Sequence, residues 1–311
     1  MPGASRPAPD GPAPAAALQL AALAPAPSPA DDARRAVAIG PSGEVYEPDG
    51  KGAWVRRQRL TTATSISLAA RAGGAVLALG DGVVYRLAPN GWSALRLAQK
   101  DKAKLSAGWS AVAAVGRQLL ALDRMAGGEP AKLGAAAGEV LLLGSGKSVV
   151  VATDRGLFRL TGAKLAPLAA PRRARMLVGD QWAIVDGGAV DLRTGRITAW
   201  PAGAAVDLAA AAPDDGLIAV ARAAGKLELL SVRAGKLERA PIEVAAVAPA
   251  PAPALVASLT PIGVAADRAG RAVVAFRDGR IAVRDGATWT TVAVTEQLPP
   301  AHPGAPPAPS R

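Results

Sequence analysis

The chain has 311 residues, no cysteine, one histidine and a formal net charge of +11 at pH 7. Without cysteine it has no disulfide, thiolate nucleophile, iron–sulfur cluster or cysteine-ligated zinc site. The only histidine, His302, lies in the proline-rich stretch PPAHPGAPPAPSR, which argues against a catalytic triad or a histidine-ligated metal centre. The positive charge is spread along the chain, which argues against a nucleic-acid binder, since such a protein would carry a basic stripe or block. A diffuse charge favours anionic partners without specifying one, and solubility is its simpler explanation.

Both ends of the chain are rich in alanine and proline. We predict a disordered N-terminal segment over residues 1–33, one folded domain over residues 34–298 and a disordered tail over residues 299–311. No stretch reaches the roughly eighteen consecutive apolar residues of a membrane span. As the apolar region of a signal peptide, AAALQLAALA, residues 15–24, is short, follows several prolines and lacks a basic region before it beyond Arg6. We expect a cytoplasmic protein by default, or a periplasmic or secreted one if the true start lies upstream.

Residues 36–55, AVAIGPSGEVYEPDGKGAWV, introduce a pattern that returns along the chain. A short apolar run meets a glycine-containing turn, a second run follows, and another glycine turn leads to a third run. Runs this short, rich in Val, Ile and Leu and separated by Asp-Gly or Asn-Gly, are typical of antiparallel hairpins. The sequence therefore predicts an all-β fold.

The repeating unit is complete in residues 65–98. Within it ISLAARAG, GAVLALGDG, VVYRLAPNG and WSALRLA read as four strands joined by three tight turns. The same four-part pattern fits residues 138–168, 174–202, 204–244 and 255–296. Two units are less regular, because the one around QLLALDRMAGGEPAKL lacks a clear third strand and the one at residues 36–55 lacks an obvious first strand.

The spacing of the units indicates the architecture. The expected second strands start near seven residues, Val37, Val76, Leu119, Val149, Ala183, Leu217 and Val273. Their average spacing of about 39 residues is close to the length of one four-stranded propeller blade. The sequence therefore predicts a β-propeller of about seven four-stranded blades, with six or eight as alternatives.

Three tryptophans follow the turn before the expected fourth strand. Trp92, Trp289 and Trp200 lie one, three and five residues after Gly91, Gly286 and Gly195, so they share one parity of that strand and one of its faces. We expect their rings to pack as wedges between neighbouring blades, and the alternative is a role in stacking on a ligand.

The segments GLFRLTG and VVAFRDGRIAVRDGATW resemble the repeats of two-component-regulator and related WD40-like bacterial propellers. The matching residues are Thr153, Asp154, Gly156, Leu157, Phe158, Arg159, Asp278, Gly279, Asp285, Gly286 and Trp289. The resemblance covers most of residues 36–296, although the Gly-His to Trp-Asp pairing of WD40 repeats is missing. It implies a propeller with a sensing or protein-scaffolding role, and it transfers no catalytic residue.

Three dense basic runs are the sharpest functional feature: Arg56, Arg57 and Arg59; Lys100, Lys102 and Lys104; and Arg172, Arg173 and Arg175. The second and third runs lie where a fourth strand is expected to lead into the next blade. Such loops emerge on one face of a propeller, so the runs are candidates for a basic patch that contacts an acidic partner. The competing interpretation is a set of solvated loops.

Two other patterns have a chemical interpretation and a structural one. Asp81, Asp154, Asp186 and Asp278 recur at one repeat position and are candidate cation ligands, but repeated hairpin turns explain the same recurrence. The stretch GSGKS, residues 144–148, matches only the end of a phosphate-binding loop and leads into the strand-like VVVAT. We interpret it as a hairpin turn.

The function expected from the sequence is binding. No catalytic constellation is present, and we expect no catalytic residue, cofactor or bound metal. The leading hypothesis is a non-enzymatic binding or scaffold module that holds a protein partner, through an acidic surface, on its loop face. The alternatives are a metal-dependent propeller lyase or hydrolase that uses the four aspartates and a ligand-sensing propeller domain.

Overall fold

The computed structural model describes residues 22–25, 36–39, 44–48, 54–59, 68–72, 75–80, 83–88, 91–96, 103–107, 111–126, 129–168, 173–212, 214–245, 259–266 and 271–293. These residues form strands and turns, with no helix among them. The strands make seven four-stranded antiparallel sheets. Strands that follow one another in the chain are neighbours in each sheet, so every sheet is a simple meander.

The strands of the first four blades have the following bounds. The first blade contains β1 (Ala22–Pro25), β2 (Ala36–Ile39), β3 (Glu44–Pro48) and β4 (Trp54–Arg59). The second contains β5 (Leu68–Ala72), β6 (Ala75–Gly80), β7 (Val83–Ala88) and β8 (Gly91–Arg96). The third contains β9 (Ala103–Ala107), β10 (Ala111–Val115), β11 (Gln118–Ala126) and β12 (Glu129–Ala135). The fourth contains β13 (Val140–Ser145), β14 (Val149–Thr153), β15 (Gly156–Thr161) and β16 (Lys164–Pro167).

The last three blades follow the same plan. The fifth contains β17 (Met176–Val178), β18 (Trp182–Val185), β19 (Gly188–Asp191) and β20 (Ile197–Ala199). The sixth contains β21 (Ala205–Ala212), β22 (Gly216–Ala223), β23 (Lys226–Arg233) and β24 (Lys236–Pro241). The seventh contains β25 (Pro261–Ala266), β26 (Ala272–Phe276), β27 (Arg280–Asp285) and β28 (Thr288–Ala293).

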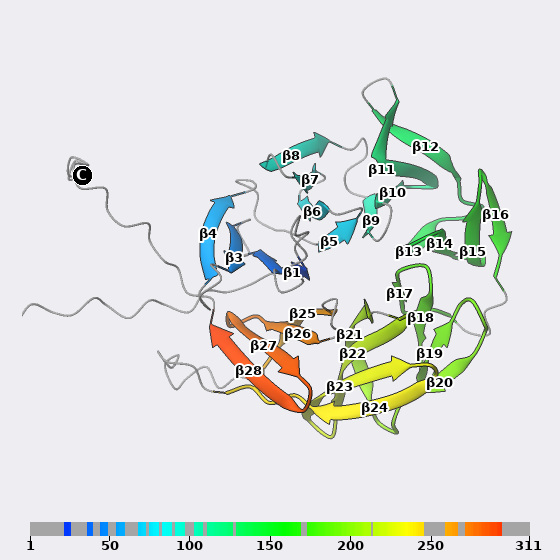
Figure 1. Ribbon diagram of the computed structural model, residues 1–311. Helices are drawn as coiled ribbons and strands as arrows, with labels where there is room; N and C mark the ends of the chain where they lie inside the picture. The colour runs from blue at the N-terminus through cyan, green and yellow to red at the C-terminus, as the bar shows by residue number, and fades with distance from the viewer. Residues whose placement is uncertain are drawn as a thin grey trace, which may run out of the picture.

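The seven sheets are arranged as the blades of a closed ring (Figure 1). The first strands of the blades contact one another in the circuit β1, β5, β9, β13, β17, β21 and β25, and β25 contacts β1 again. Each sheet takes its four strands from one stretch of chain, so the ring closes by packing of the first blade on the last, without an exchanged strand. The described residues therefore form an all-β, seven-bladed propeller, as the repeat spacing predicts.

Burial within the blades follows the position of each strand. The second strands β14, β18 and β22 are buried almost throughout, which confirms that both of their faces are covered. The fourth strands β16 and β24 lie at the rim and are mostly exposed. The core is thus formed largely by the second strands, whose apolar residues follow one another without alternation.

Two details of the predicted repeat are wrong. Leu119 lies in β11, the third strand of its blade, and the second strand is the alanine-rich β10. The first blade does have a first strand, because β1 pairs with β2 in an antiparallel register. Since β1 lies inside residues 1–33, the folded domain begins before residue 34. β1 and β10 are alanine-rich and lack the Asp-Gly or Asn-Gly turn signal. These residues therefore form strands because they pair with neighbouring strands, and not because of their intrinsic preference.

Tryptophan rings pack between neighbouring blades, as predicted. Trp200 belongs to a cluster that joins the fifth and sixth blades and includes Ile184 and Leu217. Trp289 packs against a cluster that joins the sixth and seventh blades and includes Val220 and Phe276. The ring of Trp92 lies outside the described side chains. The wedges make contacts between successive sheets, and these contacts hold the ring together.

Candidate functional site

One face of the propeller collects two kinds of chain segment. In a four-stranded meander, the turn between the second and third strands emerges at the same end of the blade as the connection to the next blade. We call this end the connection face. Its described turns are residues 116–117, 154–155, 186–187, 224–225 and 277–279, and its described connections include residues 173–175 and 200–204.

The structure describes the side chains of four of the nine basic residues in the three runs. Arg173 and Arg175 are exposed in the connection that leads into β17, on the connection face. Lys104 is exposed as the second residue of β9, and Arg56 is exposed within the rim strand β4. The four residues belong to three blades. The side chains of Arg57, Arg59, Lys100, Lys102 and Arg172 lie outside the described part.

The connection face carries four further basic side chains that do not belong to the dense basic runs. Each stands alone in or beside a turn between a second and a third strand, and all four are exposed: Arg117, Arg155, Lys226 and Arg277. They come from the third, fourth, sixth and seventh blades. A comparison of equivalent turn positions along the repeat would have found them, because one basic residue recurs near that turn in each of these blades.

The recurring aspartates lie in the same turns. Asp186 accepts a hydrogen bond from the Arg175 guanidinium at 3.2 Å, and Asp278 is paired with Arg280 and caps its own turn by accepting from the Arg280 backbone N–H. Asp154 is exposed, and Asp81 lies outside the described residues. Within the described ranges no three His, Cys, Asp or Glu side chains are placed to share a metal ion. Turn formation and ion pairing with arginine therefore account for Asp186 and Asp278.

The GSGKS stretch is a hairpin turn, as interpreted from the sequence. It joins β13 to β14, on the face opposite the connection face. Ser148 donates two hydrogen bonds to the Asp180 carboxylate of the next blade, from its backbone N–H at 2.7 Å and from its hydroxyl at 2.8 Å. Its polar groups thus link the fourth and fifth blades.

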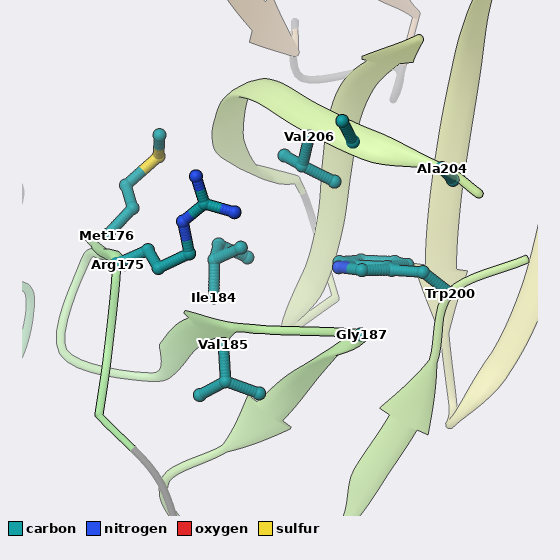
Figure 2. A pocket seen from close by; sticks show the side chains of 9 residues that line it. Arg175, Met176, Ile184, Val185, Gly187, Trp200, Ala204 and Val206 are labelled. Carbon is teal, nitrogen blue, oxygen red and sulfur yellow. The ribbon is translucent and has the colours of Figure 1, made fainter. Parts of the chain in front are cut away.

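A small pocket opens on the connection face between the fifth and sixth blades (Figure 2). It is lined by Arg175, Met176, Ile184, Val185, Gly187, Trp200, Ala204, Ala205 and Val206. The guanidinium of Arg175 and the indole nitrogen of Trp200 point toward the same space above Ile184, and the remaining walls are apolar (Figure 2). A cation and a neutral N–H donor thus converge on one cavity, which the sequence alone did not indicate.

Solved β-propellers, among them a WD40 domain, have a similar fold. The chain is similar to the WD40 propeller domain of Doa1, with 13% sequence identity, a TM-score of 0.57, and coverage of 88% of this chain and 96% of that one. It is similar to PorZ, a surface component of the type-IX secretion system of Porphyromonas gingivalis, with 15% identity and a TM-score of 0.57. That match covers 94% of this chain and 40% of PorZ.

A third similar structure is YCF48 from Cyanidioschyzon merolae, with 14% identity, a TM-score of 0.56, and coverage of 87% and 96% of the two chains. No protein-family profile and no curated protein matches the sequence. At these identities the likeness establishes the fold and leaves the function to the chemistry of the connection face. No described segment forms a helix long and apolar enough to cross a membrane.

Proposed function

We infer that this propeller is a non-enzymatic binding module that holds an acidic protein surface on its connection face. The observation that carries the proposal is the set of exposed basic side chains on that face: Arg117, Arg155, Arg173, Arg175, Lys226 and Arg277. A single exposed cation contributes little to affinity, but several on one surface raise its potential together and attract anionic groups. The net charge of +11 acts in the same direction.

The arginines and lysine suit a protein partner. They are distributed one or two to a blade around the ring, a spacing suited to a broad surface with dispersed carboxylates. Stacking on nucleic-acid bases requires exposed aromatic rings, whereas the described tryptophans Trp182, Trp200 and Trp289 pack within or between blades. Interactions between exposed charges are screened by salt, so the proposed binding is salt-dependent.

Charge reversal on one face tests the proposal. The triple variant Arg155→Glu, Arg173→Glu and Arg277→Glu is expected to lower affinity for a fluorescein-labelled poly-L-glutamate peptide by about tenfold at low ionic strength, measured by fluorescence anisotropy. The difference from the unmodified chain should shrink as sodium chloride is added, because the Debye length falls to about 8 Å at physiological ionic strength.

The matched control reverses three exposed lysines on the opposite face, with Lys147→Glu, Lys164→Glu and Lys236→Glu. It changes the net charge by the same amount, so a general effect of charge would weaken both variants equally. Equal loss in the two variants would refute the proposal of a face-specific surface. Equally tight binding of a single-stranded DNA oligonucleotide would refute the preference for a protein partner.

A further inference from the structure

The indole of Trp200 is buried without a partner for its N–H. The residue is 8% exposed, and among the described residues its Nε1 has no hydrogen-bond partner. The other two tryptophans with described side chains do have acceptors in the neighbouring blade. Trp182 donates to the backbone carbonyl of Asp215 at 3.2 Å, and Trp289 donates to that of Pro241 at 2.9 Å. A buried donor left unpaired is costly, so an acceptor delivered to Trp200 from outside gains more than the same contact in water.

The unpaired N–H faces the pocket between the fifth and sixth blades. Arg175 lies across this pocket from the indole nitrogen, and Ile184 and Val206 form apolar walls (Figure 2). The cavity volume is about 40 Å³, which is enough for a small polar group and too little for a sugar or nucleotide. The Arg175 side chain is 65% exposed, so it is free to move outward and admit a group to the indole.

The two donors define the chemistry of the group. A carboxylate has two oxygens, one of which can accept from the indole N–H while the other accepts from the Arg175 guanidinium. A cation would be repelled by Arg175, and a neutral amide has only one acceptor oxygen and no negative charge to pair with the guanidinium. The apolar walls fit a short aliphatic stem behind the carboxylate.

Asp186 competes with an arriving carboxylate for the Arg175 guanidinium. Its carboxylate binds Arg175 Nη1 at 3.2 Å, and its side chain is 83% exposed. An ion pair this exposed is weak, and Arg175 has further N–H donors besides Nη1. An arriving carboxylate therefore shares or replaces the contact with Asp186 at little cost.

We propose that the pocket of Trp200 and Arg175 is a carboxylate-binding subsite that takes a glutamate side chain of the partner. The assignment of the carboxylate to a partner's side chain rests on the proposed binding function. The subsite itself rests on the unpaired indole N–H, the facing guanidinium and the size of the cavity. It makes one blade junction the anchor point of the connection face, while the other basic side chains supply long-range attraction.

The indole ¹H–¹⁵N resonances of the full chain test the subsite. The signal of Trp200 is identified by its loss in Trp200→Phe, and it is followed during titration with butyrate and with a short blocked peptide containing one glutamate. Both are expected to shift it to saturation, while the already paired indoles of Trp182 and Trp289 stay in place. The same peptide with glutamine is expected to leave the signal unmoved.

Substitutions at the two donors and at the competing carboxylate are expected to change the affinity for the glutamate peptide by different amounts. Trp200→Phe keeps an aromatic ring, though a smaller one, and removes the donor, and it should weaken binding of the glutamate peptide about fivefold. Arg175→Gln should weaken binding about tenfold, because the charge is lost. Asp186→Asn should strengthen it about threefold by removing the competing charge.

Each failure points to a different part of the proposal. A Trp200 signal that neither butyrate nor the glutamate peptide moves would overturn the subsite, and so would an equal response to the glutamine peptide. A response to butyrate alone would overturn the assignment to a side chain and leave a site for a free carboxylate. If the unmodified chain fails to bind poly-L-glutamate while its Trp200 signal still responds to butyrate, the proposed function is refuted and the subsite is not.

Discussion

Replacing Phe276 by alanine is expected to lower the free energy of unfolding by about 3 to 5 kcal/mol. Phe276 is fully buried in β26, where it packs in the cluster that joins the sixth and seventh blades. Alanine leaves a cavity bounded by Val220, Leu227 and Ala282, whose backbones are fixed in three different strands. Such a site cannot collapse around the smaller side chain, so the loss includes both the transfer of the ring and the cavity.

Urea unfolding followed by tryptophan fluorescence and circular dichroism measures this loss. Ile197→Ala is the control, because Ile197 is a large apolar residue of β20 that is 43% exposed. Its replacement should change the free energy of unfolding by no more than about 0.5 kcal/mol. A Phe276→Ala effect as small as that of the control would contradict the packing of the sixth blade against the seventh.

Gly144→Ala is expected to destabilise the protein by about 3 kcal/mol. Gly144 lies in β13, the innermost strand of the fourth blade, and a Cβ atom there would collide with the carbonyl oxygen of Gly179 at the end of β17. The obstruction is backbone, so a change of side-chain rotamer cannot relieve it. The first strands of the fourth and fifth blades would have to separate.

Gly116→Ala separates this collision from the general effect of replacing glycine. A Cβ at Gly116 meets nothing within 4 Å, and only its φ of +59° opposes the substitution. We expect a loss of about 1 kcal/mol there from the left-handed conformation. Thermal unfolding of the two variants compares them directly. Equal losses would contradict the close approach of β13 to β17.

The propeller was predictable because its turns are written in the sequence. Asp81-Gly82 and Asn90-Gly91 mark the ends of β7, and the strands of the second blade fall where residues 65–98 place them. Because this four-strand unit recurs along the chain, counting its copies predicts the number of blades. The failures occur where these signals are missing, as at β1 and at β10, whose following turn contains Gly116 and Arg117.

The candidate site was less predictable, for a physical reason. Dense basic runs are visible in a linear sequence, whereas Arg155, Lys226 and Arg277 reach one face only through the closed ring of blades. The subsite depends on the lack of a described hydrogen-bond acceptor for the Trp200 indole N–H. Nothing in the sequence distinguishes Trp200 from Trp289, since both follow a glycine turn and both wedge between blades. The difference is that the Pro241 carbonyl accepts from the indole of Trp289, whereas no group in the described part of the chain accepts from the indole of Trp200.

The most direct test of the proposed binding face is a millisecond hydrogen-exchange footprint of bound poly-L-glutamate on the full chain. Protection is predicted at backbone amides in turns 154–155 and 277–279 and in the connection 173–175. Turns 162–163 and 234–235, on the opposite face, should exchange as in the free protein. Protection on the opposite face, or equal protection on both faces, would contradict the account.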